Sequence, residues 1–220
     1  MLLIRAAIVC LSGILLIGAL LFFPAGTLDY PGGQRLMLLV FAPMVLLSVV
    51  LLIRAPALLE KRLRSREKEK GQPAVIAAAA LMFTLAFVLA GLDFRFRLTR
   101  VPSWLMAAAC VLLVLAYGLY AEVMRENAYL SRTIEVQEGQ TVVDTGLYGV
   151  VRHPMYAVTL VLFLSMPLVL GSWLSMAVML AYPFIIVARI RGEERLLMRE
   201  LPGYAAYIQR VRWRLIPGIW

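Results

Sequence analysis

Six apolar segments separated by short polar stretches make up most of the chain. They cover residues 4–23, 36–53, 74–91, 101–120, 155–172 and 173–188. Crossing about 30 Å of hydrocarbon takes roughly 20 helical residues, and only helices or closed barrels satisfy their backbone polar groups there. Long uninterrupted apolar runs favour helices. We therefore expect an all-α fold, a polytopic membrane helical bundle of about six transmembrane segments with a cytoplasmic C-terminal helix.

The last two segments are predicted to form a tight helical hairpin. They are shorter than the others, contain Pro167 and Pro183, and are separated only by Gly171 and Ser172. A glycine and a serine between two apolar runs are typical of a turn. The first segment is longer than the apolar part of a typical signal peptide and has no A-x-A cleavage site after it, so we interpret it as a span.

Composition also indicates an integral membrane protein. Apolar residues make up 62% of the chain and the mean hydropathy is +0.85, whereas roughly half of a soluble domain is apolar. Cys10 and Cys110 lie inside apolar runs, so we expect packing residues and no metal site.

The distribution of charge predicts the orientation in the membrane. The chain has 22 Lys and Arg against 13 Asp and Glu. If successive segments cross the membrane in alternate directions, 18 of these 22 basic residues lie on the side that holds the N-terminus. Cytoplasmic loops are enriched in Lys and Arg, so both termini are expected in the cytoplasm. The net charge of +9 then indicates contact with anionic lipids and not with nucleic acid. Residues 54–72 alternate charges, which is typical of a solvated helix or strap along the inner leaflet.

The sequence V-V-D-T-G-L-Y-G-V-V-R-H-P-M-Y at residues 142–156 contains the single histidine of the chain. Gly146 predicts a turn with positive φ, and Pro154 predicts a helix start, because proline presets helical φ and lacks an N–H that would be unpaired there. Arg152 and His153 then lie at a helix N-terminus, where free N–H groups favour an anion such as a carboxylate. Alternatively, Arg152 is a membrane-interface anchor and His153 a helix cap.

A second cluster of charge follows the last apolar segment. Arg189 and Glu193 are four residues apart and Arg191 and Glu194 are three apart, so each pair lies on one side of a continuing helix. They are either ion pairs of an ordinary charged helix or part of a site that the hairpin brings to residues 152–153. The same helix carries an apolar face, against the membrane or the rest of the protein, formed by Leu196, Leu197, Leu201, Tyr204 and Tyr207.

Together the two clusters predict a site for a charged, water-soluble molecule from the cytosol and a lipophilic one from the bilayer. Ionisable side chains near hydrocarbon are costly, which makes them functional candidates. The sequence contains no G-x-G-x-x-G, P-loop, H-E-x-x-H or G-x-S-x-G motif. We divide the chain into N-terminal transmembrane helices, residues 1–121, and a catalytic region, residues 122–220.

At these residues the sequence resembles the isoprenylcysteine carboxyl methyltransferase family, including its bacterial members and the more distant phospholipid N-methyltransferases. The resemblance rests on G-L-Y-G-V-V-R-H-P-M-Y at 146–156 and on R-x-x-x-E-E with L-P-G-Y-x-x-Y-x-x-R-V at 189–211. It implies a methyltransferase of the bacterial inner membrane that binds S-adenosylmethionine at the cytoplasmic face and takes a lipophilic or prenylated acceptor from the bilayer.

The resemblance also implies roles for individual residues. Arg189 matches an arginine near the methyl acceptor. Gln137 corresponds to a further cofactor contact in the polar linker, residues 122–146, which is shorter here than in the eukaryotic members of the family. The matching carboxylate aligns to Glu193 or Glu194, so both are candidate catalytic residues together with Arg189. Implied cofactor contacts are Gln140, Thr141, Val142, Val143, Tyr148, His153, Pro154, Met155, Tyr156 and Glu193.

These residue types suit methyl transfer in themselves. The reaction is an in-line displacement at a carbon activated by a sulfonium, so the protein mainly positions donor and acceptor and excludes water. Tyr148 and Tyr156 would face the sulfonium or stack on adenine. Arg152 and His153, with the N–H groups of the helix start, would hold the methionine carboxylate.

The chemistry of the acceptor stays open. Arg189 would orient a carboxylate acceptor, which is already ionised at pH 7. A thiol or amine acceptor would instead need a base, either Glu193 or Glu194. A free isoprenoid acid, a small thiol, a phospholipid amine and a quinone precursor all suit the layout.

Two other functions are compatible with the sequence. Sterol reductases, which would use NADPH, share a C-terminal I-P-x-I-aromatic pattern that is present at residues 216–220, but they favour R-H-x-N-Y where this chain has R-H-P-M-Y at 152–156. A non-catalytic membrane scaffold or small transporter subunit would account for an N-terminal half without a chemical motif.

Overall fold

The structure, a computed structural model, describes residues 2–63, 72–130 and 135–220. Within these ranges the regular structure is helical, which confirms the all-α prediction. The helices are α1 (Leu2–Ala25), α2 (Pro31–Arg54), α3 (Pro56–Leu63), α4 (Gln72–Phe96), α5 (Ser103–Glu126), the 3-10 helix η1 (Gly146–Gly149), α6 (Pro154–Leu170), α7 (Trp173–Met179), α8 (Tyr182–Glu200) and α9 (Tyr204–Arg210). The charged strap predicted for residues 54–72 is helical up to Leu63, and its residues 64–71 lie outside the described ranges.

Five stretches in the described part of the chain are long and apolar enough to cross a bilayer. They are α1, α2, residues 73–96 of α4, α5, and the α7–α8 stretch from Trp173 to Glu200. The helix α6 is also apolar, but its 17 residues reach only about 25 Å at about 1.5 Å per residue. All six predicted segments are thus helical in an integral membrane protein, and a count of six full spans remains a prediction.

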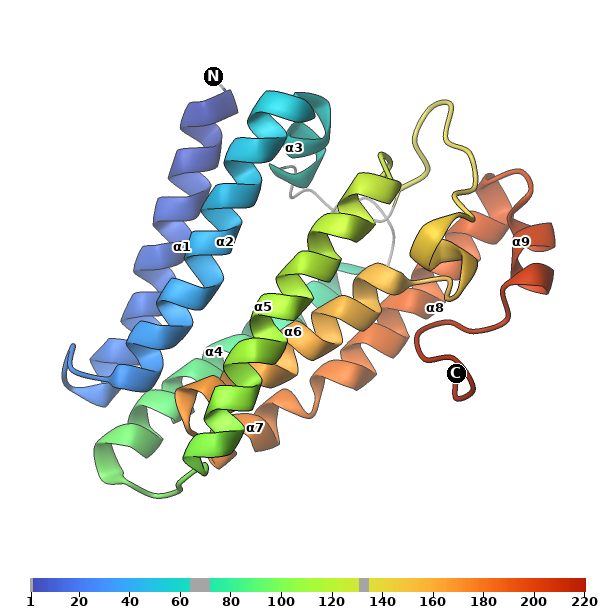
Figure 1. Ribbon diagram of the computed structural model, residues 1–220. Helices are drawn as coiled ribbons and strands as arrows, with labels where there is room; N and C mark the ends of the chain where they lie inside the picture. The colour runs from blue at the N-terminus through green and yellow to red at the C-terminus, as the bar shows by residue number, and fades with distance from the viewer. Residues whose placement is uncertain (1, 64–71, 131–134) are drawn as a thin grey trace.

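Successive long helices alternate in direction (Figure 1). The N-terminus, α3, the linker after α5, and α9 therefore lie toward one end of the bundle, and the α1–α2, α4–α5 and α6–α7 connections lie toward the other. This arrangement brings the start of α6 and the end of α8 to the same end. Which end faces the cytoplasm remains a prediction.

The turn of the hairpin agrees with the prediction, whereas its second arm differs from the single helix that was expected. Gly171 ends α6 with φ +81°, and the Ser172 hydroxyl accepts a hydrogen bond from the Ser175 N–H at 3.0 Å. The predicted segment 173–188 is two helices, because Pro183 lies in the first turn of α8, where its missing N–H leaves no internal bond unmade.

Two buried polar residues hold the end of the bundle opposite the linker. The Tyr30 hydroxyl donates to the Leu170 carbonyl at 2.8 Å, which joins the start of α2 to the end of α6. The buried Asp93 carboxylate of α4 accepts from the hydroxyls of Thr99 and Ser172, both at 2.5 Å. Because these bonds satisfy polar groups away from water, they fix how the helices are placed relative to one another.

We expect Gly91→Ala to destabilise the protein. A Cβ at this position of α4 would lie 2.5 Å from the carbonyl oxygen of Leu21 in α1, and forcing the helices apart costs about 1–3 kcal/mol. Thermal unfolding in detergent measures this loss. Gly118→Ala in α5 is the matched control, since no atom of residues 2–63, 72–130 or 135–220 lies within 4 Å of its added Cβ. Equal unfolding temperatures for the two variants would contradict the close contact.

Candidate active site

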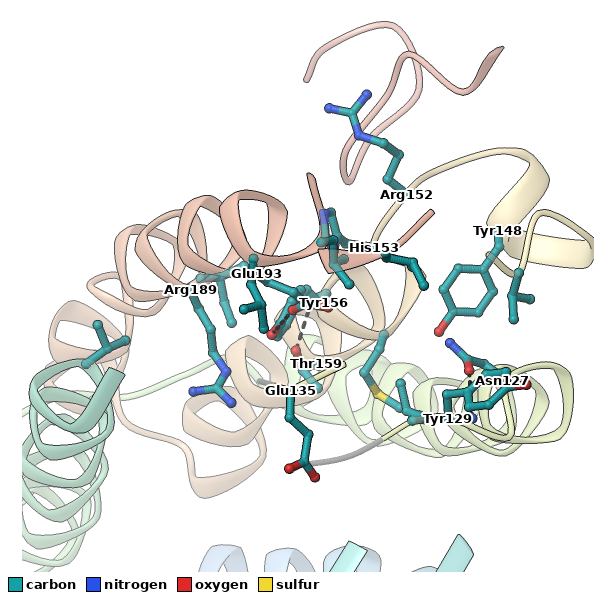
Figure 2. Close-up of a pocket in the computed structure, with 18 of the residues that line it drawn as sticks. Asn127, Tyr129, Glu135, Tyr148, Arg152, His153, Tyr156, Thr159, Arg189 and Glu193 are labelled. Carbon is teal, nitrogen blue, oxygen red and sulfur yellow. Dashed lines mark hydrogen bonds between the residues drawn. The ribbon is translucent and has the colours of Figure 1, made fainter. Parts of the chain in front are cut away.

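A cavity of about 520 Å³ lies where α4, α6 and α8 meet the linker and α9 (Figure 2). Part of its wall is polar and comes from residues 127–148 and α9, with Asn127, Tyr129, Glu135, Gln140, Thr141, Tyr148, Tyr204 and Tyr207. The other part is mainly apolar and comes from the membrane helices, with Val75, Ile76, Ala79, Phe83, Phe163, Ile185 and Ile186. One space is therefore shared by polar groups from the linker and apolar groups from the bundle.

The two parts of the wall meet at Tyr156 and Glu193. The Tyr156 hydroxyl donates a hydrogen bond to Glu193 Oε2 at 2.6 Å, which connects the first turn of α6 to α8 (Figure 2). Arg189 lines the same cavity one turn before Glu193, on the same side of α8. The prediction that the segments 146–156 and 189–194 come together is confirmed by these contacts.

Glu194 has a different environment from Glu193. Its carboxylate accepts from Arg152 Nε and Arg214 Nε, both at 2.8 Å, and lies 3.2 Å from His153 Nε2. It is outside the cavity wall. Of the two alternatives for Glu194, an ion pair within its own helix or a contact with residues 152–153, the structure shows the second. Of the two candidate carboxylates, Glu193 is the one in a position to meet a ligand.

Arg152 is held within the protein and not at the membrane interface. Its side chain is 4% exposed, and Nη1 donates to the carbonyls of Val211 and Arg212 at 2.9 Å each, besides the Nε bond to Glu194. Figure 2 shows Arg152 directed away from the Tyr156–Glu193 pair. The interface-anchor interpretation is wrong, because Arg152 is buried. Arg152 also lines the cavity, so its predicted binding of a cofactor carboxylate remains a prediction beside the observed pairing with Glu194.

The backbone explains why this motif lies beside the C-terminal segment. The N–H groups of Arg152 and His153 donate to the carbonyls of Trp213 and Arg214, both at 2.9 Å. His153 is the N-cap residue of α6, as the cap interpretation has it, although its side chain makes no capping bond. Pro154 begins α6 as predicted. This pairing directs the His153 ring to the cavity and leaves Pro154 in the helix turn, outside the wall.

The C-terminal pattern I-P-G-I-W forms a turn beside this motif. The carbonyl of Trp220 accepts bonds from the N–H groups of Arg214, Leu215 and Ile216, and the Arg214 guanidinium lies 5.2 Å from the Trp220 ring centroid. Trp220 also packs against the hydrophobic cluster that contains Ile190 and Leu215. These contacts explain the pattern at residues 216–220, which resembles that of sterol reductases, as a structural feature of the C-terminal segment.

The linker is shaped by its own side chains. Gln137 Nε2 donates to the Tyr129 carbonyl at 2.5 Å, and the Gln137 N–H donates to Gln140 Oε1 at 2.9 Å. Gln137 is therefore a residue that shapes the linker and lies outside the wall, whereas Gln140 to Val143 line the cavity as expected. Residues 131–134 of this linker lie outside the described ranges.

Three tyrosines of the wall are buried and neutral. Burial raises the pKa of Tyr148 well above its usual value, although a hydrogen bond with Asn127 lowers it in part. Burial also raises the pKa of Tyr207 to about 12, and the Tyr207 hydroxyl donates to the Tyr148 carbonyl at 2.7 Å. The pKa of Tyr204 is raised strongly, again chiefly by burial. All three hydroxyls keep their protons at neutral pH.

Tyr204 is the residue that sequence analysis most clearly missed. It was placed on an apolar face, and that face does pack against the rest of the protein, with Leu201, Tyr204 and Tyr207 next to Val142 of the linker. Its hydroxyl, however, is buried and has no hydrogen-bond partner among the described residues. Leaving such a group unpaired costs about 1–3 kcal/mol, so it is a candidate ligand contact.

Residues before position 122 also contribute to the wall. Arg62 of α3 lines the cavity, and its guanidinium lies 5.4 Å from the ring centroid of Tyr120. From α4 come Val75, Ile76, Ala79 and Phe83. The alternating charges of residues 54–72 predict a solvated strap and give no signal for a site. A span that is apolar on every side likewise does not show which face lines a site.

The fold and the site define an integral membrane protein with a cavity whose wall is partly polar and partly apolar. Residues 104–203, from α5 to the start of α9, match the phospholipid methyltransferase family. The resemblance to membrane methyltransferases that the motifs indicated is thereby confirmed for this region. An uncharacterized protein of Bacillus subtilis (strain 168), YpbQ, is 29% identical over 96 residues, which are 43% of this chain and 57% of YpbQ. The chain thus aligns with little more than half of that relative.

Proposed function

We propose that this protein transfers a methyl group from S-adenosylmethionine to a lipophilic acceptor. The observation that carries this proposal is the single cavity in which a polar wall and an apolar wall meet at the hydrogen-bonded Tyr156 and Glu193. Methyl transfer requires a polar donor and a second substrate to lie end to end in a space with little water. The family match over residues 104–203 agrees with this chemistry.

The polar wall offers groups that fit the cofactor. Tyr204 has a buried hydroxyl with no hydrogen-bond partner in the described part of the chain. Gln140 and Asn127 have side-chain amides, and Tyr148 has an aromatic ring. Glu193 adds a carboxylate that suits the positive charge of the donor. Bound there, S-adenosylmethionine would supply an activated methyl group on a sulfonium.

Residues at the junction of the two walls would position the acceptor. Arg189 would hold a carboxylate acceptor by charge and hydrogen bonds. For a thiol or amine acceptor Glu193 would accept the proton, because Glu194 is committed to Arg152 and Arg214. The apolar wall would take a prenyl or acyl chain from the bilayer. An isoprenylcysteine-like carboxylate is therefore one acceptor among several of this kind.

The side of the membrane follows from charge. The end of the bundle with the cavity also carries most of the basic residues, so we place it at the cytoplasmic face, next to anionic lipids. A cysteine-labelling map that finds the exposed residue 57 on the outer face would overturn this orientation.

Ligand binding tests the proposed function against its alternatives. Purified protein in nanodiscs is titrated with S-adenosylmethionine, its demethylated product and NADPH. Saturable binding of the first two, followed by methyl transfer to a lipid extract, is the expected result. Preference for NADPH would instead support a reductase, and no binding of any of the three a non-catalytic scaffold.

Tyr204→Phe should weaken cofactor binding by about 2- to 10-fold, the effect of one lost hydrogen bond. The apparent unfolding temperature of the ligand-free protein should not fall, because the deleted hydroxyl bonds to none of the residues that the structure describes. Tyr117→Phe is the matched control: its hydroxyl donates to the Val40 carbonyl at 3.0 Å, so its loss should lower stability and leave affinity unchanged. Unchanged cofactor affinity in Tyr204→Phe would remove Tyr204 from the cofactor site.

A further inference from the structure

Three aromatic rings lie together at the membrane end of the apolar wall. The ring centroids of Phe83 and Phe163 are 4.9 Å apart at 82°, and those of Phe163 and Tyr182 are 5.0 Å apart at 78°. Phe83 and Tyr182 are 5.9 Å apart. The three rings come from α4, α6 and α8, so each helix that lines the apolar wall contributes one.

The cavity ends at these rings on all three helices. Its wall on α4 runs from Val75 to Phe83, and on α6 from Met155 to Phe163. On α8 the wall begins at Tyr182. Just beyond the rings the packing is dense, since Ala86 and Met179 are fully buried. The rings are thus the floor of the apolar part of the cavity.

Phe163 and Tyr182 of the floor lie at the same depth below the junction of the two walls. Tyr156 and Phe163 are seven residues apart on α6, and Tyr182 and Arg189 are seven apart on α8. At about 1.5 Å per residue, both intervals correspond to about 10 Å. A hydrogen bond between the Tyr182 hydroxyl and Thr159 Oγ1 at 3.1 Å holds the Tyr182 ring in place across the space.

We propose that Phe83, Phe163 and Tyr182 set the length of the apolar chain that the acceptor can carry. This inference rests on the proposed function and adds a substrate class to it, single-chain amphiphiles whose tail extends about 10 Å from the reactive head. Each methylene buried above the floor favours binding by about fourfold. A longer chain meets the rings and loses this gain.

A series of straight-chain alkyl carboxylates of increasing length tests the floor in two readouts. The first is the rise in unfolding temperature that each carboxylate causes in the purified protein, and the second is methyl transfer to it from S-adenosylmethionine. The native protein should show an optimum length in the first readout. A rise in unfolding temperature that keeps growing with the length of the alkyl chain would contradict the floor, whether or not methyl transfer occurs. A length optimum without methyl transfer would leave the floor intact and exclude a carboxylate as the acceptor. A length optimum in a protein that does not bind S-adenosylmethionine would overturn the proposed function and leave the floor intact.

Substitutions should move this optimum in both directions. Phe163→Ala or Phe83→Ala removes part of the floor and should change the preference for a tail two methylenes longer by roughly fifteenfold. Ala79→Phe fills the space one turn above Phe83 and should shift the optimum to shorter tails, which keeps the test informative if the alanine variants fold poorly. Phe184→Ala is the control, because Phe184 is 77% exposed on α8 and should leave the optimum unchanged. An optimum that stays in place in both Phe163→Ala and Ala79→Phe would contradict the proposal.

Discussion

Glu193→Gln should reduce methyl transfer by about a hundredfold or more in a protein that still folds. The substitution keeps the size of the side chain and removes the negative charge beside the proposed site of the sulfonium. Loss of one preorganised electrostatic contact in an active site typically lowers the rate by about 10²- to 10³-fold. Steady-state kinetics and cofactor titration measure the effect, and the unfolding temperature reports on the fold.

The control for this prediction is Glu200→Gln on the same helix. Glu200 pairs with Arg199 at 2.7 Å on an exposed surface, so its neutralisation should not change the rate. Tyr156→Phe removes the hydrogen bond to Glu193, and its effect on cofactor affinity should be non-additive with that of Glu193→Gln because the two groups are in contact. A Glu193→Gln variant with native kinetics would contradict the assignment of this carboxylate.

Glu194→Ala should unfold the protein far more readily than any change at Glu193. It leaves the guanidinium of Arg152, 4% exposed, without its carboxylate, and breaking a buried pair on one side costs about 3–5 kcal/mol. For a chain of this size such a loss lowers the unfolding temperature by about 10 °C. Thermal scans in one detergent at one scan rate provide the comparison.

An exposed ion pair provides the reference for Glu194. Asp144 and Arg210 are 2.6 Å apart, with 37% and 65% of their side chains exposed. Asp144→Asn should therefore cost no more than about 1 kcal/mol. If Glu194→Ala is as stable as Asp144→Asn, the cluster of Arg152, Glu194 and Arg214 does not hold the C-terminal segment in place.

Two adjacent carboxylates thus have separate tasks that their positions on a helix explain. Successive residues of an α-helix point about 100° apart, so Glu193 and Glu194 cannot face the same neighbours. Glu193 faces the cavity and Tyr156, whereas Glu194 faces the segment with Arg214. The motif alignment could not separate them, because it orders residues along the chain and carries no direction around the helix.

The same limit applies to Arg152. The sequence placed it correctly beside a helix that begins at Pro154, and a helix N-terminus is a reasonable anion site. The anion that it meets is Glu194, 42 residues later in the chain. A sequence pattern does not show whether the carboxylate that an arginine binds belongs to the protein or to a ligand. Local reasoning could therefore not choose between the two.

Local chemistry in the chain was sufficient to predict the helices, the turn at Gly171 and Ser172, and the approach of the first turn of α6 to the end of α8. Each of these depends on signals within a few residues: apolar run length, glycine with positive φ, and proline in the first turn of a helix. The hairpin connectivity then brings the two motifs to one end of the bundle.

The folded arrangement was needed to assign the remaining parts of the site. The floor of Phe83, Phe163 and Tyr182, the contribution of Arg62, and the unpaired hydroxyl of Tyr204 all depend on contacts between helices far apart in the chain. A membrane helix is apolar on every side, so its sequence does not show which face meets a neighbour, a lipid or a substrate. That choice is made by packing, and packing exists only once the helices are assembled.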